Sequence, residues 1–406
     1  MRTCSMLTSL NGWRSLLGFA VLSLQACASA ETLTVALYPY VPERHEIFTT
    51  LEAEFERKNP GVDLVLSEPP AWNRDYYSEQ ADKLASETKG DVFEIDTLRL
   101  SDYVEKDLIA SLPSRMTAGV DHSLLEAVTR SGHVYAIPRW LCGKVLVYRA
   151  GSEDIEKAQT LDELFQVAAA HHQTILADIY GTTTIGEWYL SLLADKKGIA
   201  DAQADVLAAG APDSDVMSTL ARLLDVCPYP YCRSSYDHEA AGFYAREFAR
   251  GKAVAYIGYS ETLHYAIDEL TNNCGPGSSC IDAKDIRVKA LPRMTRHASN
   301  PPLGWVDGLA ISAKLTGRKK HLAEAFVIWA TSSEVQSMVL GSSPVPKYLV
   351  PATRDFTHKD APLYPQIYEA LKERSTGTES GLNSSLRQLV KQSIHCQLPR
   401  SDCTPK

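Results

Sequence analysis

The chain has little that points to a membrane, a nucleic acid or a nucleotide. After residue 30 it contains no apolar run long enough to cross a bilayer, and no glycine-rich phosphate loop follows a predicted strand. It also lacks an excess of positive charge. Residues 1–30 carry two arginines and no acidic residue, so the net charge of −9 becomes −11 without them. We therefore expect no integral membrane segment and no binding to nucleic acid or anionic lipid.

The one long apolar stretch lies at the N-terminus and has the features of an export signal. Two arginines precede or flank the run SLLGFAVLSLQA, and the small residues ACASA follow it. This order predicts a signal peptide over residues 1–30 with cleavage after Ala30, so the protein is expected to be periplasmic or secreted. The sequence LQAC leaves a lipoprotein open, with a lipid on Cys27, although Gln25 fits that pattern poorly.

Cysteine is scarce after residue 30, and six of the seven that remain form three close pairs. Each pair brackets proline, so the chain between its members can turn back on itself. An oxidising compartment favours disulfides at such spacings, whereas zinc sites use tighter pairs or a histidine cluster, which this sequence lacks. We therefore predict disulfides and no metal. The predicted pairs are Cys227–Cys232, Cys274–Cys280 and Cys396–Cys403.

This pairing leaves Cys142 alone in the segment PRWLCGKVLVYR, residues 138–149. An unpartnered cysteine in an exported protein indicates a reactive thiol or an intermolecular bridge, and the alternative is a buried cysteine that serves as a small apolar side chain. Counting cysteines does not decide between them. The surrounding segment alternates like a strand, but it is long for one strand and is broken by Pro138, so it could cross between two lobes.

Strands and helices alternate along the first part of the chain. Apolar alternation predicts the strands, and four-residue apolar spacing with a stop at Asn59-Pro60-Gly61 predicts the first helix. This βαβαβ order predicts an α/β fold in which helices layer a parallel sheet, and 406 residues are enough for two lobes. The expected strands are 31–37, 62–68 and 91–96, and the expected helices are 43–58, 74–90 and 98–112.

The order of these pieces resembles the extracellular solute-binding proteins of the type II periplasmic-binding-protein fold. The matching phrases include FERKNPGVDLVL, GHVYAIPRW, FARGKAVAYIGYS and GLAISA followed by AEAFVIWATS. The resemblance implies two α/β lobes with a ligand cleft between them. The expected division places residues 31–140 with about 285–335 in lobe 1, and residues 141–284 with about 336–406 in lobe 2.

A narrower resemblance lies in DVFEIDTLRLSDYVEKDLI, IPRWLCG, YIGYSE and GWVDG. Together these motifs are similar to thiamine pyridinylase, the type-I thiaminase family, which uses the same fold as an enzyme. The resemblance implies a cysteine nucleophile at Cys142 and a glutamate base at Glu261. It also implies carboxylates against the pyrimidine of thiamine and aromatic residues along the cleft. On that pattern the substrate-binding residues are Tyr38, Tyr40, Asp96, Tyr259, Trp305 and Asp307.

The chemistry of thiamine cleavage suits these residue types. Attack on an electron-poor ring needs a thiolate, and a free cysteine is mostly protonated at neutral pH. A glutamate kept from water has a raised pKa, so Glu261 could take the proton of Cys142. Asp96 or Asp307 could hydrogen-bond the pyrimidine, and carboxylates and aromatic faces attract the cationic thiazolium. Lys144 would favour the thiolate but repel that cation, so it is assigned no role.

Most of these residues also have an ordinary structural explanation. Glu261 could lie in the first turn of a helix, Asp96 could cap the helix that follows it, and Asp307, before a glycine, could belong to a turn. Tyrosines are abundant here, so any one of them could be a surface or core residue. The combination of an unpartnered Cys142 with Glu261 favours catalysis.

Two functions therefore stay open. The first is thiamine pyridinylase, a transferase that exchanges the thiazole of thiamine for a small amine or thiol acceptor and needs no cofactor. The second is a solute-binding protein that delivers thiamine or another small molecule to an ABC-type transporter. The fold suits both, but a binder has no need of a nucleophile. In either case we expect a monomer. A serine hydrolase is disfavoured because the chain has no nucleophile-elbow motif.

Overall fold

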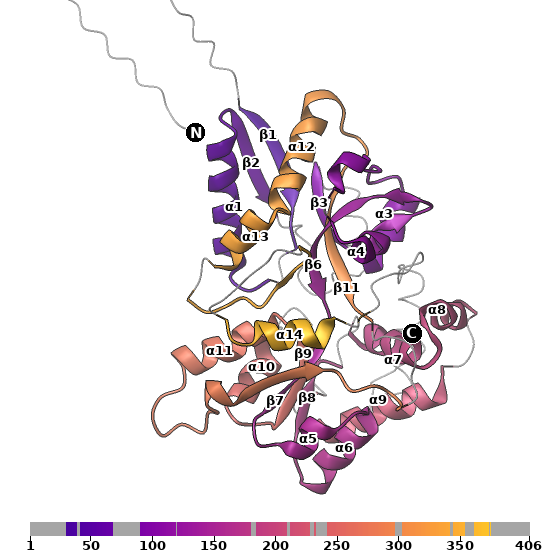
Figure 1. Ribbon diagram of the computed structural model, residues 1–406, viewed down its shortest axis with the longest axis vertical. Coiled ribbons are helices and arrows are strands. Elements are labelled where there is room, and N and C mark those ends of the chain that lie inside the picture. The colour runs from indigo at the N-terminus through magenta and orange to yellow at the C-terminus, as the bar shows by residue number, and fades with distance from the viewer. Residues whose placement is uncertain are drawn as a thin grey trace, which may run out of the picture.

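The computed structural model describes residues 30–38, 41–67, 90–118, 120–179, 184–208, 212–227, 231–232, 242–296, 303–341, 344–353, 361–372 and 374. Within these residues the chain forms two lobes, one above the other in Figure 1, and each lobe is built around its own β-sheet. The expected two-lobed α/β fold is confirmed.

Lobe 1 contains a six-stranded mixed sheet in the order β12-β6-β11-β3-β1-β2. Strand β1 pairs in parallel with β2 and β3, as helical crossovers require, and β11 runs antiparallel to β3 and β6. Leu33 and Val35, two alternate residues of β1, are fully buried. The strands are β1 (Glu31–Ala36), β2 (Val62–Ser67), β3 (Val92–Asp96), β6 (Ala136–Cys142), β11 (Trp305–Ile311) and β12 (Val350–Pro351).

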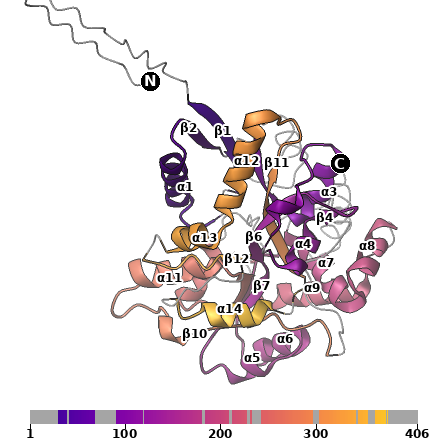
Figure 2. The ribbon, with the colours of Figure 1, turned by 45° about the horizontal axis from the view of Figure 1, so that its top comes forward.

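Helices cover this sheet by burying one apolar face each. Helix α1 (Arg44–Lys58) follows the predicted four-residue spacing, and its Leu51 and Phe55 are buried. The Phe55 ring packs against Phe326 and Trp329 of α12, with ring centroids 5.1 Å away in both cases. In Figure 2, α1 and α12 lie on the upper lobe. The other lobe 1 helices are α3 (Leu100–Glu105), α4 (His122–Ala127), α12 (Gly317–Ala330) and α13 (Ser333–Leu340).

The helix expected over 98–112 is shorter than predicted. It consists of a 3-10 turn, Thr97–Arg99, followed by α3, which ends at Glu105. Asp107 then takes a left-handed conformation with φ of 51°, and Ile109 forms an antiparallel bridge to Ser312. The residues after Glu105 therefore pair with the chain at the end of β11 instead of extending the helix. The helix expected over 74–90 lies outside the described residues, except for Gly90.

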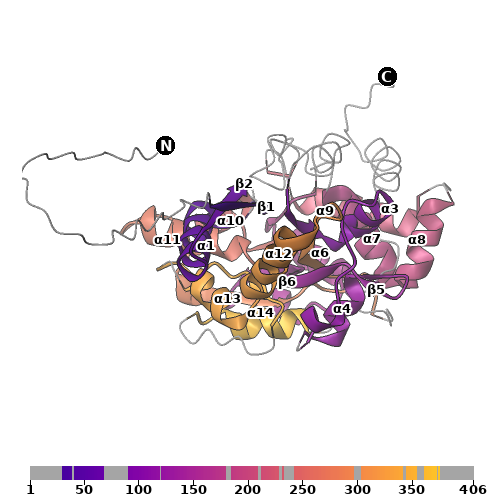
Figure 3. The same ribbon diagram turned by 90° about the horizontal axis from the view of Figure 1, so that it is seen from above.

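Lobe 2 contains a four-stranded sheet in the order β10-β7-β9-β8. Strand β7 is antiparallel to β10 and β9, and β8 is parallel to β9. Seen from above in Figure 3, α11 and α8 lie at opposite ends of this lobe. The strands are β7 (Lys144–Arg149), β8 (Ile175–Ala177), β9 (Ala255–Tyr259) and β10 (Ile286–Ala290). The helices are α5 (Glu153–Lys157), α6 (Leu161–Ala170), α7 (Thr184–Lys197), α8 (Ile199–Leu207), α9 (Ser214–Val226), α10 (Gly242–Ala249), α11 (Thr262–Asn272) and α14 (Tyr364–Leu371).

The segment around Cys142 does cross between the lobes. Cys142 ends β6 in the lobe 1 sheet, and β7 of lobe 2 begins after one intervening residue, Gly143. A Cβ atom on Gly143 would lie 2.8 Å from Leu371 and from Arg374. Arg374 donates hydrogen bonds to the backbone oxygens of Leu303, at 2.6 Å, and of Lys144. A larger residue where the two lobes join would therefore have to displace the side chains of Leu371 and Arg374.

The expected lobe boundaries need two corrections. Strand β10 pairs with β7 in the lobe 2 sheet, although residues from about 285 were placed in lobe 1. Strand β12 pairs with β6 in the lobe 1 sheet, although residues from about 336 were placed in lobe 2. The chain therefore returns to lobe 1 between β10 and β11, and leaves it again between β12 and α14.

Two of the predicted disulfides are confirmed. Cys227 bonds to Cys232 and Cys274 bonds to Cys280, while the predicted Cys396–Cys403 pair lies outside the described residues. Cys142 is the free cysteine of the described part of the chain. Among the helices in that part, none has the length and apolar character that crossing a bilayer requires.

Candidate active site

One pocket between the lobes brings together seven of the predicted site residues. Strands β3, β6 and β11 and the end of β1 supply its lobe 1 side, and β9 and the start of α11 supply its lobe 2 side. The eighth predicted residue, Tyr40, lies outside the described residues. The lining residues are Tyr38, Asp96, Cys142, Tyr259, Glu261, Trp305 and Asp307.

The register of the lobe 1 sheet places the central members of this group. Strand β11 lies between β3 and β6, so Asp307 is directly opposite Asp96 on one side, and Trp305 is directly opposite Cys142 on the other. Directly opposed residues of antiparallel strands project to the same face. The register shifts between Asp307 and Gly308, an irregularity of the kind that often re-aims side chains near functional sites.

The thiol of Cys142 is held against a carboxyl group. Its Sγ lies 3.4 Å from Oδ2 of Asp307, within hydrogen-bond distance for sulfur. Burial raises the pKa of the Cys142 thiol well above its ordinary value, and the nearby Asp307, Glu261 and Asp96 raise it further because a thiolate would be repelled by their negative charge. Cys142 is therefore a thiol at neutral pH and needs a base before it can act as a nucleophile.

Asp307 is a carboxyl group that the site makes harder to ionise. Its pKa lies well above the ordinary value, first because it is buried and then because Asp96 and Glu94 are close. Like-charged carboxylates that share a buried site cannot all ionise easily. A protonated Asp307 can donate a hydrogen bond to a ligand, which a carboxylate cannot do.

Glu261 has the properties of a base at neutral pH. It lies immediately before α11, but its side chain makes no capping hydrogen bond to that helix. The Ser260 hydroxyl lies 3.4 Å from its Oε2. Burial raises the pKa of Glu261 to about 7, although hydrogen bonding and the positive charge of Lys144 act in the opposite direction. Near pH 7 this group can both accept and release a proton.

The aromatic residues of the pocket are fixed from behind. The Tyr259 hydroxyl donates a 2.6 Å hydrogen bond to Oε2 of Glu187, and the backbone N–H of Tyr38 donates a 2.8 Å hydrogen bond to Oε2 of Glu94. Arg139 donates to the other oxygen of Glu94 at 2.8 Å. Both Arg139 and Glu94 are buried. These partners fix the ring of Tyr259 and the backbone at Tyr38 before a ligand arrives.

Sequence reasoning missed three residues of this supporting layer: Glu94, Arg139 and Glu187. A signal existed for Glu94, because it alternates with Asp96 along β3 and alternate residues of a strand share a face. A charged residue there, between apolar neighbours, indicates a buried polar network. Glu187 carried no comparable signal, because only the packing of α7 brings it to the pocket.

The electrostatic character of the pocket favours a cation. Three carboxyl groups line it, and the lining residues include no lysine, arginine or histidine. The described residues form no cluster of the kind that holds a metal ion.

The pocket is small. The free space among its lining residues is about 20 Å³, which is room for about one water molecule. This space is too small for a small organic ligand in the arrangement that the structure shows.

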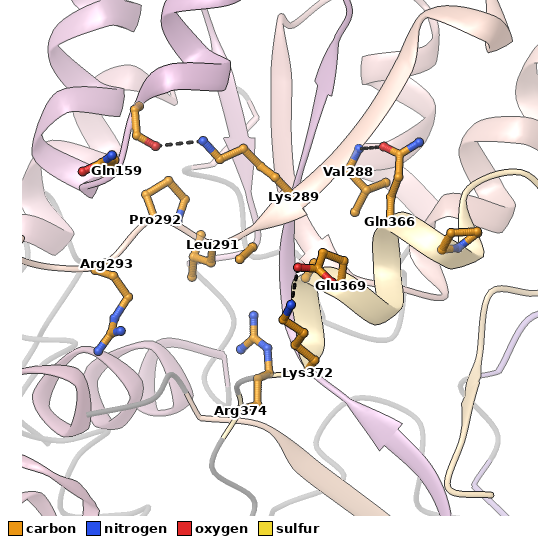
Figure 4. A pocket seen from close by; sticks show the side chains of 14 residues that line it. Gln159, Val288, Lys289, Leu291, Pro292, Arg293, Gln366, Glu369, Lys372 and Arg374 are labelled. Atoms are coloured by element: carbon orange, nitrogen blue, oxygen red, sulfur yellow. Dashed lines mark hydrogen bonds and ion pairs between the residues drawn. The ribbon is translucent and has the colours of Figure 1, made fainter. Parts of the chain in front are cut away.

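A larger cavity of about 650 Å³ lies on lobe 2 between β10 and α14 (Figure 4). It contains none of the predicted site residues. Its lysines have structural partners: Lys289 donates to backbone oxygens at the end of α5, including that of Ala158 at 2.8 Å, and Lys372 pairs with Glu369. This cavity is the less suitable site for a cation, because cationic side chains line it.

Comparison with known proteins identifies the family. Residues 50–361 match the family described as bacterial extracellular solute-binding protein. This match covers most of the chain, so the protein belongs to that family. The fold and the family are both found in exported proteins, in agreement with the expected localisation.

The chain is also similar to thiaminases. It is 26% identical to thiaminase-1 of Paenibacillus thiaminolyticus over 376 residues, which cover 88% of this chain and 81% of that protein. The structure of Clostridium botulinum thiaminase I in complex with thiamin superposes with a TM-score of 0.69 at 23% identity, covering 89% of this chain and 97% of that one. A eukaryotic thiaminase-I bound to the thiamin analogue 3-deazathiamin gives a TM-score of 0.62 at 18% identity, with 89% and 98% covered.

Proposed function

We propose that the protein is a thiamine pyridinylase, an exported enzyme that cleaves thiamine by exchanging its thiazole for another base. The observation that carries this proposal is the meeting of a free cysteine and a glutamate with a pKa of about 7 in one carboxylate-rich pocket. Similarity to thiaminase-1 supports the same substrate. A pocket made only for transport would need neither a nucleophile nor a base.

The first half of the proposed reaction forms a covalent adduct. Thiamine enters between the open lobes, and its thiazolium is attracted by the carboxylates and aromatic faces of the pocket. When the lobes close, Glu261 takes the proton of Cys142, and the thiolate adds to the electron-poor pyrimidine ring. The bond between the methylene and the thiazolium nitrogen then breaks, and the thiazole leaves as a neutral ring with the bonding electrons.

Asp307 and Asp96 would assist this step from the opposite side of the pocket. A protonated Asp307 can donate a hydrogen bond to a pyrimidine nitrogen and so draw electrons from the ring as the thiolate attacks. The ionised form of a second carboxyl group can accept from the exocyclic amine. Such prearranged partners stabilise charge that develops in the transition state without later rearrangement.

The second half transfers the pyrimidinylmethyl group to a small amine or thiol acceptor. The acceptor attacks the methylene and loses its own proton to solvent, the carbon–sulfur bond breaks, and the released thiolate of Cys142 recovers its proton from Glu261. No electron is gained or lost overall, so the proposed reaction is a transfer between nucleophiles. Glu261 carries the proton of Cys142 out and back, and no step of this sequence calls for a cofactor.

Intact mass after incubation with thiamine tests the proposal directly. Wild-type protein should gain the mass of the pyrimidinylmethyl fragment while free thiazole appears, and Cys142→Ser should do neither. Glu261→Gln should slow both halves, because Cys142 loses its base and the leaving thiolate loses its proton donor, so release of thiazole should fall. Thiamine binding without thiazole release in the wild type would contradict the proposal.

The family itself favours a second candidate, a solute-binding protein that delivers thiamine or another small cation to a transporter. The closed, carboxylate-lined pocket suits a bound cation as well as a reacting one. The same experiment separates the two functions, because a delivery protein leaves thiamine intact and its own mass unchanged.

A further inference from the structure

A buried charge pair lies directly behind the pocket, in lobe 2. Lys144 begins β7, two residues after Cys142, and is directly opposite Tyr259 of β9. Its Nζ lies 4.7 Å from the centroid of the Tyr259 ring and 3.2 Å from its hydroxyl. Lys144 is 8% exposed. A full positive charge is therefore enclosed by protein against one of the aromatic residues that line the pocket.

Glu187 of α7 balances this charge. It is 1% exposed, and its Oε2 accepts hydrogen bonds from Lys144 Nζ at 2.9 Å and from the Tyr259 hydroxyl at 2.6 Å. The ring of Trp188, the next residue of α7, lies 5.6 Å from the same ammonium group. One carboxylate oxygen thus holds both the lysine and the tyrosine in a fixed arrangement.

This pair is difficult to explain as a source of stability. Moving two charges out of water costs about as much free energy as their attraction returns. Its position suggests a different role, because an unbalanced ammonium behind Tyr259 would oppose the attraction that the carboxyl groups of the pocket exert on a cation. Because Glu187 balances its charge, the lysine contacts Tyr259 without weakening that attraction.

We propose that Glu187 is a specificity-determining residue, which cancels the charge of Lys144 behind Tyr259 so that the pocket prefers a cationic ring to an uncharged one of the same shape. This proposal rests on the proposed function, since it takes thiamine as the cationic ligand. It goes further by assigning the selection for charge to residues that do not themselves line the pocket.

A pair of matched ligands can test this balance. Thiamine carries a positive charge on its thiazolium, and 3-deazathiamin, which has carbon in place of the charged ring nitrogen, does not. Binding of both would be measured by calorimetry in the Cys142→Ser protein, which does not consume ligand. The informative quantity is the ratio of the two affinities, because general damage to the pocket weakens both ligands and leaves the ratio unchanged.

The two partners of the pair should shift this ratio in opposite directions. At a separation of roughly 8 Å and an effective dielectric constant of about 20, one unit charge on the protein changes the binding constant of a singly charged ligand by roughly 30-fold. Glu187→Gln should therefore reduce the preference for thiamine by about tenfold or more, and Lys144→Met should increase it. The double variant, which leaves no unpaired buried charge and so should fold even if a single variant does not, should keep the parent ratio.

Asp195→Asn provides a matched control. Asp195 is another buried carboxylate of α7, but it pairs with Arg293 and does not reach Tyr259, so its loss should leave the ratio unchanged. A ratio that stays at the parent value in both single variants would overturn the proposed charge balance while leaving the proposed substrate intact. If the Cys142→Ser protein bound neither ligand, the proposed substrate would be wrong, and the charge balance would fall with it.

Discussion

Replacing Glu261 by glutamine should make the protein more stable and less active at the same time. The carboxyl group has a pKa of about 7, compared with an ordinary value of 4.5, chiefly because it is buried. The folded protein therefore resists ionisation of this group. Glutamine has nearly the same shape and never ionises, so the variant avoids the penalty.

The sign and the size of the stability change follow from the pKa. Below about pH 4.5 the group is protonated in the folded and unfolded states, so it contributes no difference. Between 4.5 and 7 the unfolded chain loses the proton while the folded chain keeps it, so stability falls as pH rises. One pKa unit corresponds to about 1.4 kcal/mol, so the penalty approaches about 3 kcal/mol above pH 7. Because Glu261 is only half-buried, solvent screening makes the measured penalty smaller than this value.

Urea denaturation at pH 4.5 and pH 8 measures this effect. The two proteins should have similar free energies of unfolding at pH 4.5, and Glu261→Gln should be the more stable at pH 8. Asp268→Asn on the same helix, outside the pocket, serves as the control and should show no such pH-dependent gain. If the difference in free energy of unfolding between wild type and Glu261→Gln were the same at both pH values, the reasoning would be refuted. In activity assays, loss of a general base should cost about 10²- to 10⁴-fold in kcat/KM.

Three further substitutions test other parts of the site. Gly143→Ala should lower the free energy of unfolding by about 1–3 kcal/mol, because its Cβ has no room at the crossing; an unchanged urea midpoint would contradict the close contact. Asp96→Asn should lower the pKa of the Cys142 thiol by removing a nearby negative charge, so alkylation by iodoacetamide at pH 8 should become several-fold faster; slower alkylation would count against it. Arg139→Met should destabilise the fold by about 3–5 kcal/mol, because it leaves the carboxylate of Glu94 buried and without its cationic partner. Thermal unfolding measures this loss, and a much smaller loss would contradict the prediction.

The residues of the pocket were predicted from a family resemblance, and the motifs that carry this resemblance lie at the ends of strands. EID, LCG, GYSE and WVD are short motifs that close or open a buried run, and a sheet brings such ends together. The opposition of Asp96 to Asp307 follows from strand register, which the motifs alone do not specify. The motifs thus named the candidate residues, and long-range pairing decides which of them lie against one another.

Other features depended entirely on long-range packing. The periodicity of β10 predicts a strand but not its partner, so its pairing with β7 could not be read from the chain. Glu187 lies in a helix that has no motif of its own, and it meets Tyr259 of β9 through a side-chain hydrogen bond between residues far apart in sequence. A buried ion pair formed by residues far apart in sequence leaves no periodic signal.

The enclosed position of Cys142 has a consequence for how long such a protein lasts. Disulfides such as Cys274–Cys280 form in oxidising surroundings, where an exposed thiolate is readily converted to a sulfenic acid or to a mixed disulfide. Here the raised pKa of the Cys142 thiol keeps the sulfur protonated in the resting protein. In the proposed reaction Glu261 removes that proton only while substrate fills the cleft, so one proton transfer decides both how long the enzyme lasts and when it reacts.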